Sequence, residues 1–258
     1  MQTLLRLKEE IIMAVANSIA KKAPQQQNAA VVFMAGSEEI KLTPAMVKAY
    51  LVSGDNTAVT DQEITMFMMM CKANHLNPWI REAYCIKYGT QPATMVVGKD
   101  AFLKRAERHP QYDGMTSGII VSNDGGIEYR TGLLKFPDEQ ILGGWAEVFR
   151  RDRTHSTRIE VSFEEYAGRK KDGTLNNQWS TKPATMIRKV AQVQALKEAF
   201  PDDLGGMYTA EEQGVEETAP TNVPQIDIAE AEVVKKTAPK KAADPEPVPA
   251  DDEGDSLL

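Results

Sequence analysis

The stretch SGIIVSNDGGIEYRTGLL, residues 117–134, holds two runs rich in apolar and β-branched residues on either side of a turn sequence. Asp-Gly and Gly-Gly pairs tolerate the positive φ angles of tight hairpin turns. Asn123–Gly126 therefore predicts a turn between two antiparallel strands. Further along the chain, GWAEVFR (144–150) and TRIEVSF (157–163) predict two more strands around a basic loop.

Other regular elements are expected on both sides of these strands. AYCIKYG (83–89) and ATMVVG (93–98) predict two strands joined by a Gly-containing turn. KDAFLKRAERH (99–109) and the segment Pro183–Phe200 predict helices. The order of helices, strands and a last helix favours the α+β class, an antiparallel sheet with flanking helices, over a doubly wound α/β sheet.

Capping signals predict the shorter helices. Thr43-Pro44 places a Thr N-cap before a Pro at the first helical position. The pairs Thr60/Glu63 and Ser162/Glu165 have capping-box spacing, so each predicts the start of a helix.

The chain divides by composition into four predicted regions. Residues 3–20 have apolar positions near a 3.6-residue period, which predicts an amphipathic helix, and KKAPQQQNAA after it resembles a linker. The predicted regions are an N-terminal helix (1–22), a linker with a short extended segment (23–41), an α+β core (42–200) and an acidic, Pro-rich, mostly disordered tail (201–258).

The net charge of −7 is unevenly distributed. Residues 81–200 carry 19 Lys and Arg against 15 Asp and Glu, whereas residues 201–258 carry 4 against 15 and hold seven of the 14 prolines. The acidity therefore lies in the tail and leaves a mildly basic middle, a pattern typical of an interaction tail beside a surface for polyanions. The last eight residues, DDEGDSLL, either occupy that surface when no polyanion is bound, recruit a host partner, or simply keep the protein in solution.

Several classes of protein are excluded by what the sequence lacks. A Walker loop would need Gly at Ala93 and Ser or Thr at Asp100, so we expect no ATP dependence. The three histidines are scattered and there are only two cysteines, which argues against a zinc site and for a reducing cytoplasm. No apolar run approaches the roughly 20 residues that span a bilayer, and the N-terminus is a poor signal peptide.

A metal-dependent nuclease is one alternative. Pro137-Asp138 followed by Glu147 has the order of carboxylates found in such enzymes. A lysine usually stands two residues after the second acid, and that position holds Phe149. Glu147 is equally explained as a solvent-facing residue of a strand.

Basic residues with interleaved aromatic residues point instead to a nucleic-acid surface, since cations meet phosphates and aromatic rings stack on bases. A solvated charged face is the simpler explanation for any single cluster. On a regular helix from Pro183, Lys189 and Lys197 border the apolar stripe and Arg188 points roughly opposite, so one helix face would not present all three. The candidate DNA-binding residues are Lys87, Lys99, Lys104, Arg105, Arg150, Arg151, Arg153, Arg158, Trp179, Lys182, Arg188, Lys189 and Lys197.

An ordered set of short strings resembles one known family. The strings are LNPW (76–79), EAY (82–84), VVGKD (96–100) and QYDG (111–114), followed by Trp179 and the segment 183–200. Together they resemble the RecT/Redβ family of phage single-strand annealing recombinases, over about residues 42–200.

The resemblance implies a fold and an activity. It implies an α+β core distantly similar to the Rad52 annealing fold, with DNA in a long positive groove. It also implies that the protein binds single-stranded DNA, pairs complementary strands without ATP, and assembles into rings or helical filaments. The partners to expect are single-stranded DNA, the annealed duplex intermediate, a phage exonuclease and a host single-strand-binding protein, in the cytoplasm of the bacterial host. No cofactor is required, with Mg²⁺ as a stimulant.

Some of the DNA-binding residues of the lambda-like branch of this family have counterparts in this sequence and others do not. Trp179 matches the tryptophan that precedes the basic helix of the lambda-like branch. That helix begins Pro-Lys, whereas Pro183 is followed by Ala184 and preceded by Lys182. A second lysine of the branch falls on Val190, beside Lys189. A later arginine falls on Lys197, which keeps the charge and loses the planar fork. The alternatives to an annealing protein are the nuclease and a passive single-strand-binding protein.

Overall fold

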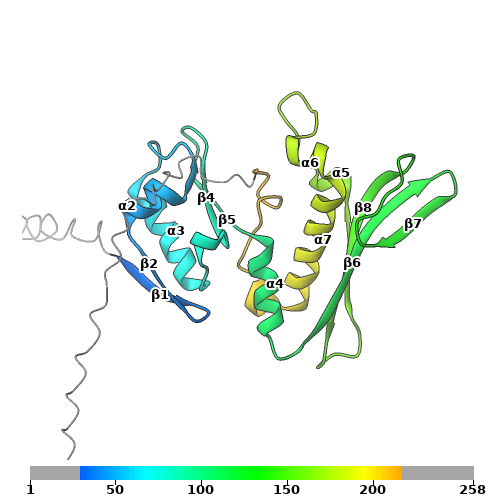
Figure 1. The fold of residues 1–258 in the computed structure, drawn as a ribbon, viewed down its shortest axis with the longest axis horizontal. Coiled ribbons are helices and arrows are strands. Elements are labelled where there is room, and N and C mark those ends of the chain that lie inside the picture. Colours follow the sequence, from blue (N-terminus) through cyan, green and yellow to red (C-terminus); the bar gives the residue numbers. More distant parts are fainter. Residues whose placement is uncertain (1–29, 217–258) are drawn as a thin grey trace, which may run out of the picture. The chain divides into compact units, whose positions relative to one another are not determined.

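The computed structural model describes residues 30–216. The helix expected over residues 3–20 lies outside that range, as do residues 217–258 of the expected tail. Figure 1 shows the arrangement of the described elements. No helix among these residues is both long enough and apolar enough to cross a membrane.

The predicted hairpin belongs to a four-stranded antiparallel sheet, with its first strand inside the sheet and its second strand at one edge. Gly118 of one hairpin strand is paired with Thr131 of the other and, on its second side, with Trp145 of the third strand. The four strand predictions are therefore confirmed, with strand order β7-β6-β8-β9. The strands are β6 (Tyr112–Asn123), β7 (Gly126–Thr131), β8 (Gln140–Arg150) and β9 (Thr157–Ser162).

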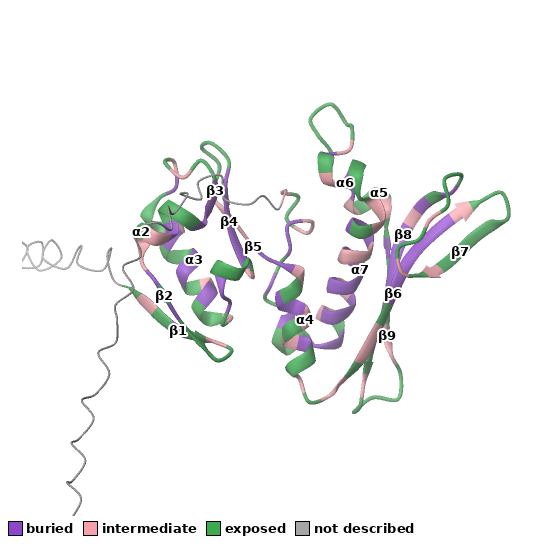
Figure 2. Cartoon of the chain, viewed as in Figure 1, coloured by how far each residue is buried: buried purple, intermediate pink, exposed green. Residues whose placement is uncertain are grey.

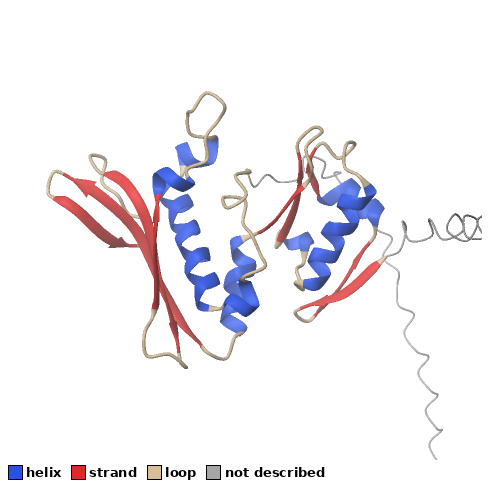
Figure 3. Ribbon diagram, turned by 180° about the vertical axis from the view of Figure 1, so that it is seen from behind, coloured by secondary structure: helices blue, strands red, loops and turns tan. Residues whose placement is uncertain are grey.

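Helix α7 (Pro183–Ala199) packs on one face of this sheet, mainly against β8 and β9. Most residues of α7 are buried, including Ile187, Ala191 and Leu196, so the helix is covered by other elements on more than one side. Figures 1 and 3 show helices on that same side of the sheet, and Figure 2 shows that buried stretches recur along α7. The smaller helices here are α4 (Lys99–Arg108), α5 (Phe163–Tyr166), α6 (Asn177–Thr181) and α8 (Pro201–Leu204).

A second sheet has the strand order β3-β4-β5. The two predicted strands, β4 (Ala83–Lys87) and β5 (Thr94–Val97), pair antiparallel. A short strand that the sequence did not reveal, β3 (Val52–Gly54), pairs parallel with β4 on its other side. β4 is therefore the central strand, and all five of its residues are buried.

The three helix starts predicted from capping signals are all present. Thr43 caps α2 (Pro44–Met46), which continues as a π-helical segment, Val47–Leu51. The capping box of Thr60 and Glu63 is formed at the start of α3 (Asp61–Ala73). Ser162 occupies the N-cap position of α5 as predicted, yet its side chain makes no capping hydrogen bond there.

The region predicted as linker and short extended segment contains a hairpin. β1 (Val31–Ala35) and β2 (Glu38–Leu42) pair antiparallel around a turn at Gly36, whose φ is 64°. Phe33 and Leu42 are buried in the core, which ties this hairpin to the rest of the chain.

The first residues of the predicted tail also fold. Leu204, Met207 and Ala210 are buried, and Val97 N–H donates to the carbonyl of Tyr208 at 2.8 Å. The acidic, Pro-rich composition of 201–258 predicts disorder for most of residues 209–258, and it does not reveal this apolar stretch at the start of the region.

Candidate nucleic-acid interface

Four cations from distant parts of the chain line one cavity of about 390 Å³. Arg81 comes from the turn after the 3₁₀ segment Pro78–Ile80, and Lys99 is the first residue of α4. Arg188 and Lys189 are consecutive residues of α7. Tyr84 of β4 supplies an aromatic side chain to the same wall. Cations and an aromatic ring around one hollow are the chemistry that a single nucleic-acid strand requires.

Arg188 faces the sheet because of a hydrogen bond to β6. Its Nε donates to Ser117 Oγ at 2.9 Å, and Gln192 Nε2 donates to the same oxygen at 2.9 Å. Arg188 and the next residue of the helix, Lys189, both line the cavity because neighbouring elements form its remaining walls, whereas Lys197 is not among the lining residues.

The start of α4 adds a favourable field to the cavity. Gly98 is the N-cap of this ten-residue helix, and Gly98, Lys99 and Asp100 all line the hollow. The N-terminal end of a helix carries a partial positive charge that favours anions. Lys99 also lies 3.6 Å from Asp100, a carboxylate that is largely exposed.

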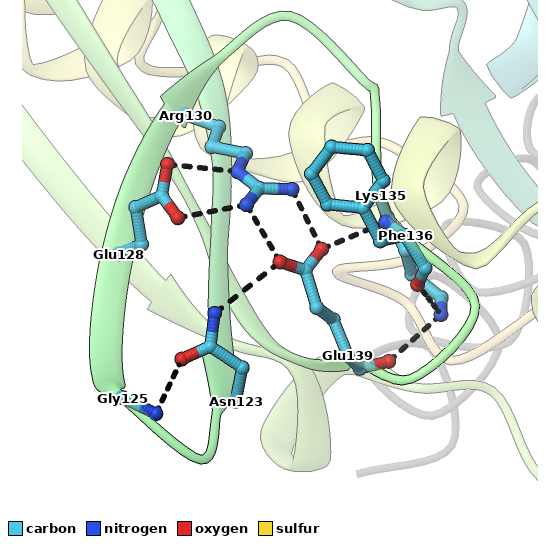
Figure 4. Close-up of polar contacts among 7 residues, drawn as sticks. All are labelled: Asn123, Gly125, Glu128, Arg130, Lys135, Phe136 and Glu139. Atoms are coloured by element: carbon cyan, nitrogen blue, oxygen red, sulfur yellow. Dashed lines mark hydrogen bonds and ion pairs between the residues drawn. The ribbon is translucent and has the colours of Figure 1, made fainter.

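A rigid loop forms another wall. Leu133 reaches the cavity from the connection between β7 and β8. Figure 4 shows how that connection is held: Arg130 donates two 2.6 Å hydrogen bonds to Glu139, and Phe136 N–H donates to the same carboxylate at 2.7 Å. Burial raises the pKa of Glu139, but the bonds from Phe136 and Arg130 outweigh it and leave that pKa below its ordinary value.

Two other basic clusters line hollows of their own. Lys104 and Arg105 line a second hollow with Arg108, but Lys104 pairs with Glu82 at 2.7 Å and Arg105 donates to the carbonyl of Asn74 at 3.2 Å. A third hollow of about 530 Å³ is lined by Tyr88, Tyr166 and three consecutive cations, Arg169, Lys170 and Lys171.

The arginines around the β8–β9 connection are bound to their own surroundings. Arg150 pairs with Asp152 at 2.7 Å, contacts the carbonyl of Ala199 and lies over the ring of Phe200. Arg151 pairs with Asp113 at 3.2 Å, while Arg153 is exposed.

Arg158 lies on the outer face of the four-stranded sheet. It covers the ring of Trp145 at 4.7 Å and pairs with Glu160 at 3.1 Å. Because residues alternate between the faces of a strand, Trp145 lies on the face opposite to Gly144, which contacts α7. Arg158 is thus separated from the cavity by the sheet.

Two predicted DNA-binding residues are buried, which places them in the core. Lys87 is 4% exposed and donates to Glu63 at 2.8 Å. That bond from Lys87, with backbone donors at Thr60 and Ala93, lowers the pKa of Glu63 to about 2. Trp179 is 2% exposed and meets Phe163 edge to face, with ring centroids 5.4 Å apart. It lines the third hollow, but almost none of its surface is open for a base to stack on.

Three predicted residues on or beside α7 differ in accessibility. Lys182, at its N-cap, is exposed. Lys189 pairs with Glu211 at 3.0 Å, and Lys197 pairs with Glu212 at 2.5 Å.

Arg81 is the cavity residue that sequence reasoning missed. It adopts a left-handed conformation with φ 63°, which few residues other than glycine, Asn and Asp take up. The only signal in the sequence is the turn-forming Asn77-Pro78 just before it. The direction of a side chain at the exit of such a turn depends on the fold and not on the local sequence.

Glu147, the second carboxylate of the nuclease alternative, takes part in contacts with its neighbours in the sheet. Glu147 accepts a hydrogen bond from Ser156 Oγ and lies 3.8 Å from Arg158, on the outer face of the sheet. Within residues 30–216, no group of three or more His, Cys, Asp and Glu side chains is placed to hold a metal ion.

Comparison with known proteins gives two matches. A family model described as the RecT family matches residues 37–224, which is most of the chain. An uncharacterized protein of Ureaplasma parvum is 29% identical over 165 residues, which make up 62% of this chain and 66% of that protein. The matched region thus spans just under two thirds of the length of this relative.

Proposed function

The chain belongs to the RecT family, and we propose that it binds single-stranded DNA and anneals complementary strands in phage homologous recombination. The observation that carries the proposal is the gathering of Arg81, Lys99, Arg188 and Lys189 around one cavity. These residues come from three separate stretches of the sequence and meet only in the folded protein, which a merely solvated charged face does not require.

In the proposed mechanism, the cavity holds the sugar–phosphate backbone. Two complementary strands repel each other through their phosphates, and the cations neutralise that charge and release counterions. The logarithm of affinity is then expected to fall with the logarithm of salt concentration by about 0.7 for each phosphate contacted on a single strand.

Pairing itself is proposed to draw its energy from the bases. If the cavity holds the backbone and leaves the base edges accessible, an incoming strand can test each position. Each correct stacked step contributes about 1–2 kcal/mol, so a matched duplex accumulates stability while a mismatched one does not. No ATP is needed for such a process, in line with the missing Walker loop in the sequence.

Self-association belongs to the same proposal. One cavity contacts only a short length of strand, so assembly into a ring or helical filament would multiply weak contacts along the DNA. We further propose that a phage exonuclease supplies the single strand, that a host single-strand-binding protein is a partner, that Mg²⁺ stimulates without being required, and that the protein acts in the cytoplasm of the bacterial host.

The deciding experiment mixes two complementary labelled oligonucleotides with the protein and no ATP. An annealing protein speeds duplex formation and has no effect on a non-complementary pair. A passive binder, the second candidate, coats each strand and leaves pairing unchanged or slower, which would overturn the annealing role. Adding Mg²⁺ and measuring product length tests the nuclease alternative, and intact strands are expected.

A further inference from the structure

The segment Met207–Glu216, here called the acidic strap, crosses from the second sheet to α7. At one side, Tyr208 accepts the backbone hydrogen bond of Val97 at the free edge of β5. Ala210 and Val215 pack onto the small apolar cluster of Tyr84, Ile86 and Val96. The strap is thus anchored by a few apolar contacts to the sheet that also forms one wall of the cationic cavity.

At its other side, the strap neutralises two lysines of α7. Glu211 lies 3.0 Å from Lys189, and Glu212 lies 2.5 Å from Lys197 and also accepts a hydrogen bond from Gln194 at 3.0 Å. All four charged side chains are at most 14% exposed. Both lysines are candidate DNA-binding residues, and in this arrangement carboxylates occupy the places where phosphates would bind.

Glu211 is only half satisfied in this position. Its Oε2 is buried and has no hydrogen-bond partner among the described residues. A buried acceptor without a partner is costly, so this oxygen offsets part of the stabilisation that the ion pair of Glu211 with Lys189 provides. Lys189 and Lys197 carry a positive charge whichever position the strap takes, so either can pair with a carboxylate of the strap or with another anion.

The strap also lies between two basic hollows. Lys189 lines the cavity with Arg81, Lys99 and Arg188, while Glu211 lines the hollow of Lys170 and Lys171. Because Lys189 and Glu211 are in contact, the negative charge of Glu211 stands where the two positive surfaces adjoin. A strand that used both surfaces would have to pass this carboxylate.

We propose that the acidic strap is an intramolecular competitor of DNA, and that a bound strand displaces Glu211 and Glu212 from Lys189 and Lys197. This inference rests on the proposed DNA-binding function. Carboxylate and phosphate oxygens are interchangeable partners of a lysine ammonium, and a phosphate brings the larger charge. The protein therefore holds its own α7 lysines masked until a polyanion competes for them.

The first test compares Glu211→Gln, Glu212→Gln and the double variant with the wild type for equilibrium binding of an oligothymidine at low salt. Each substitution removes one competing charge, so the double variant is expected to bind more tightly, by about fivefold or more. Glu198→Gln is the matched control, since it makes the same change of charge at an exposed position of α7 next to Lys197. Equal affinities of the double variant and the control would overturn the proposal.

The second test uses the wild type alone, so it stands even if a variant fails to fold. Hydrogen exchange is followed at Val97, whose amide bonds Tyr208, and at Val215, whose amide bonds Ala210. Saturating oligothymidine is expected to speed exchange at both amides as the strap leaves. Unchanged or slower exchange would overturn the proposed displacement of the strap and leave the proposed function intact. A wild type that fails to bind DNA at all would overturn the proposed function itself.

Discussion

Gly144 of β8 lies directly beneath the carbonyl group of Ile187 on α7. A Cβ atom added at Gly144 would stand 2.7 Å from that carbonyl oxygen and 3.2 Å from the backbone nitrogen of Arg188. Both neighbours are backbone atoms that cannot rotate away. The absence of a side chain at Gly144 therefore sets how closely α7, with its cavity residues Arg188 and Lys189, approaches the sheet.

Gly144→Ala is accordingly expected to lower the free energy of unfolding by about 1–3 kcal/mol, the usual cost of overpacking. It should also weaken binding of single-stranded DNA, because α7 must shift. Denaturant titration and oligonucleotide binding measure the two effects. Gly206→Ala is the control, since an added Cβ there would meet nothing within 4 Å; a loss of stability in the control as large as at Gly144 would contradict the explanation.

Lys87→Met is expected to affect stability and not DNA affinity. The substitution leaves Glu63 partly buried without its cation, and removing one member of such a pair costs about 3 kcal/mol or more. The free energy of unfolding should fall by that order, while oligonucleotide affinity at a temperature where the variant is folded stays unchanged. Lys48→Met, at an exposed position, is the control for loss of a positive charge. Weaker DNA binding by folded Lys87→Met would return this lysine to the DNA-binding surface.

The contribution of the Glu63 carboxylate to the free energy of unfolding should depend on pH. Its pKa is about 2 in the folded protein, against an ordinary value of 4.5, so the unfolded chain binds the proton more readily. The resulting stabilisation is complete above pH 4.5 and is lost as the pH falls from 4.5 towards 2. Glu63→Gln lacks this contribution, so the difference in unfolding free energy between wild type and variant should shrink across that interval. A difference that stays constant with pH would contradict it.

Trp179→Ala is expected to destabilise the protein by about 3–5 kcal/mol, as emptying a buried aromatic site does. Its ring is 2% exposed, whereas Trp79 is 41% exposed and offers the matched surface control. Trp79→Ala should cost much less stability. Thermal melting separates the two, and a Trp179 variant that keeps full stability and loses DNA affinity would instead support a stacking role.

Arg81→Met and Lys99→Met test the cavity itself. Each is expected to weaken oligonucleotide binding and to reduce the slope of log affinity against log salt by about 0.7, one phosphate contact. Lys72→Met removes an exposed cation of α3 that does not line the cavity and should leave the slope unchanged. Equal slopes for all three variants would place the DNA elsewhere.

Elements with local signals could be read from the sequence. The turn Asn123–Gly126 and the capping box at Thr60 involve residues within a few positions of each other, and both are as predicted. The strand β3 could not be predicted, because it is three residues long and its partner within residues 30–216 is β4, some thirty positions later in the chain. The β1–β2 hairpin was hidden by its position next to a linker-like sequence.

The fold decides which of the candidate DNA-binding residues lie together, and the local sequence does not reveal this. Lys99, Arg188 and Lys189 are brought together by the fold, while Lys87 is drawn inside because β4 is a central strand with no solvent-facing side. The pattern of apolar and polar residues along β4 does not show that other elements cover both of its faces. Which lysines pair with Glu211 and Glu212 depends on a segment that composition alone assigned to the tail.

The cationic cavity has walls from Arg81 through Gln192, more than a hundred positions apart along the chain. A fragment that lacks either end of this range therefore lacks part of the cavity wall. Under the proposed function, the amount of oligonucleotide bound at saturation measures the fraction of folded molecules in a preparation, and each variant's affinity is to be corrected for that fraction.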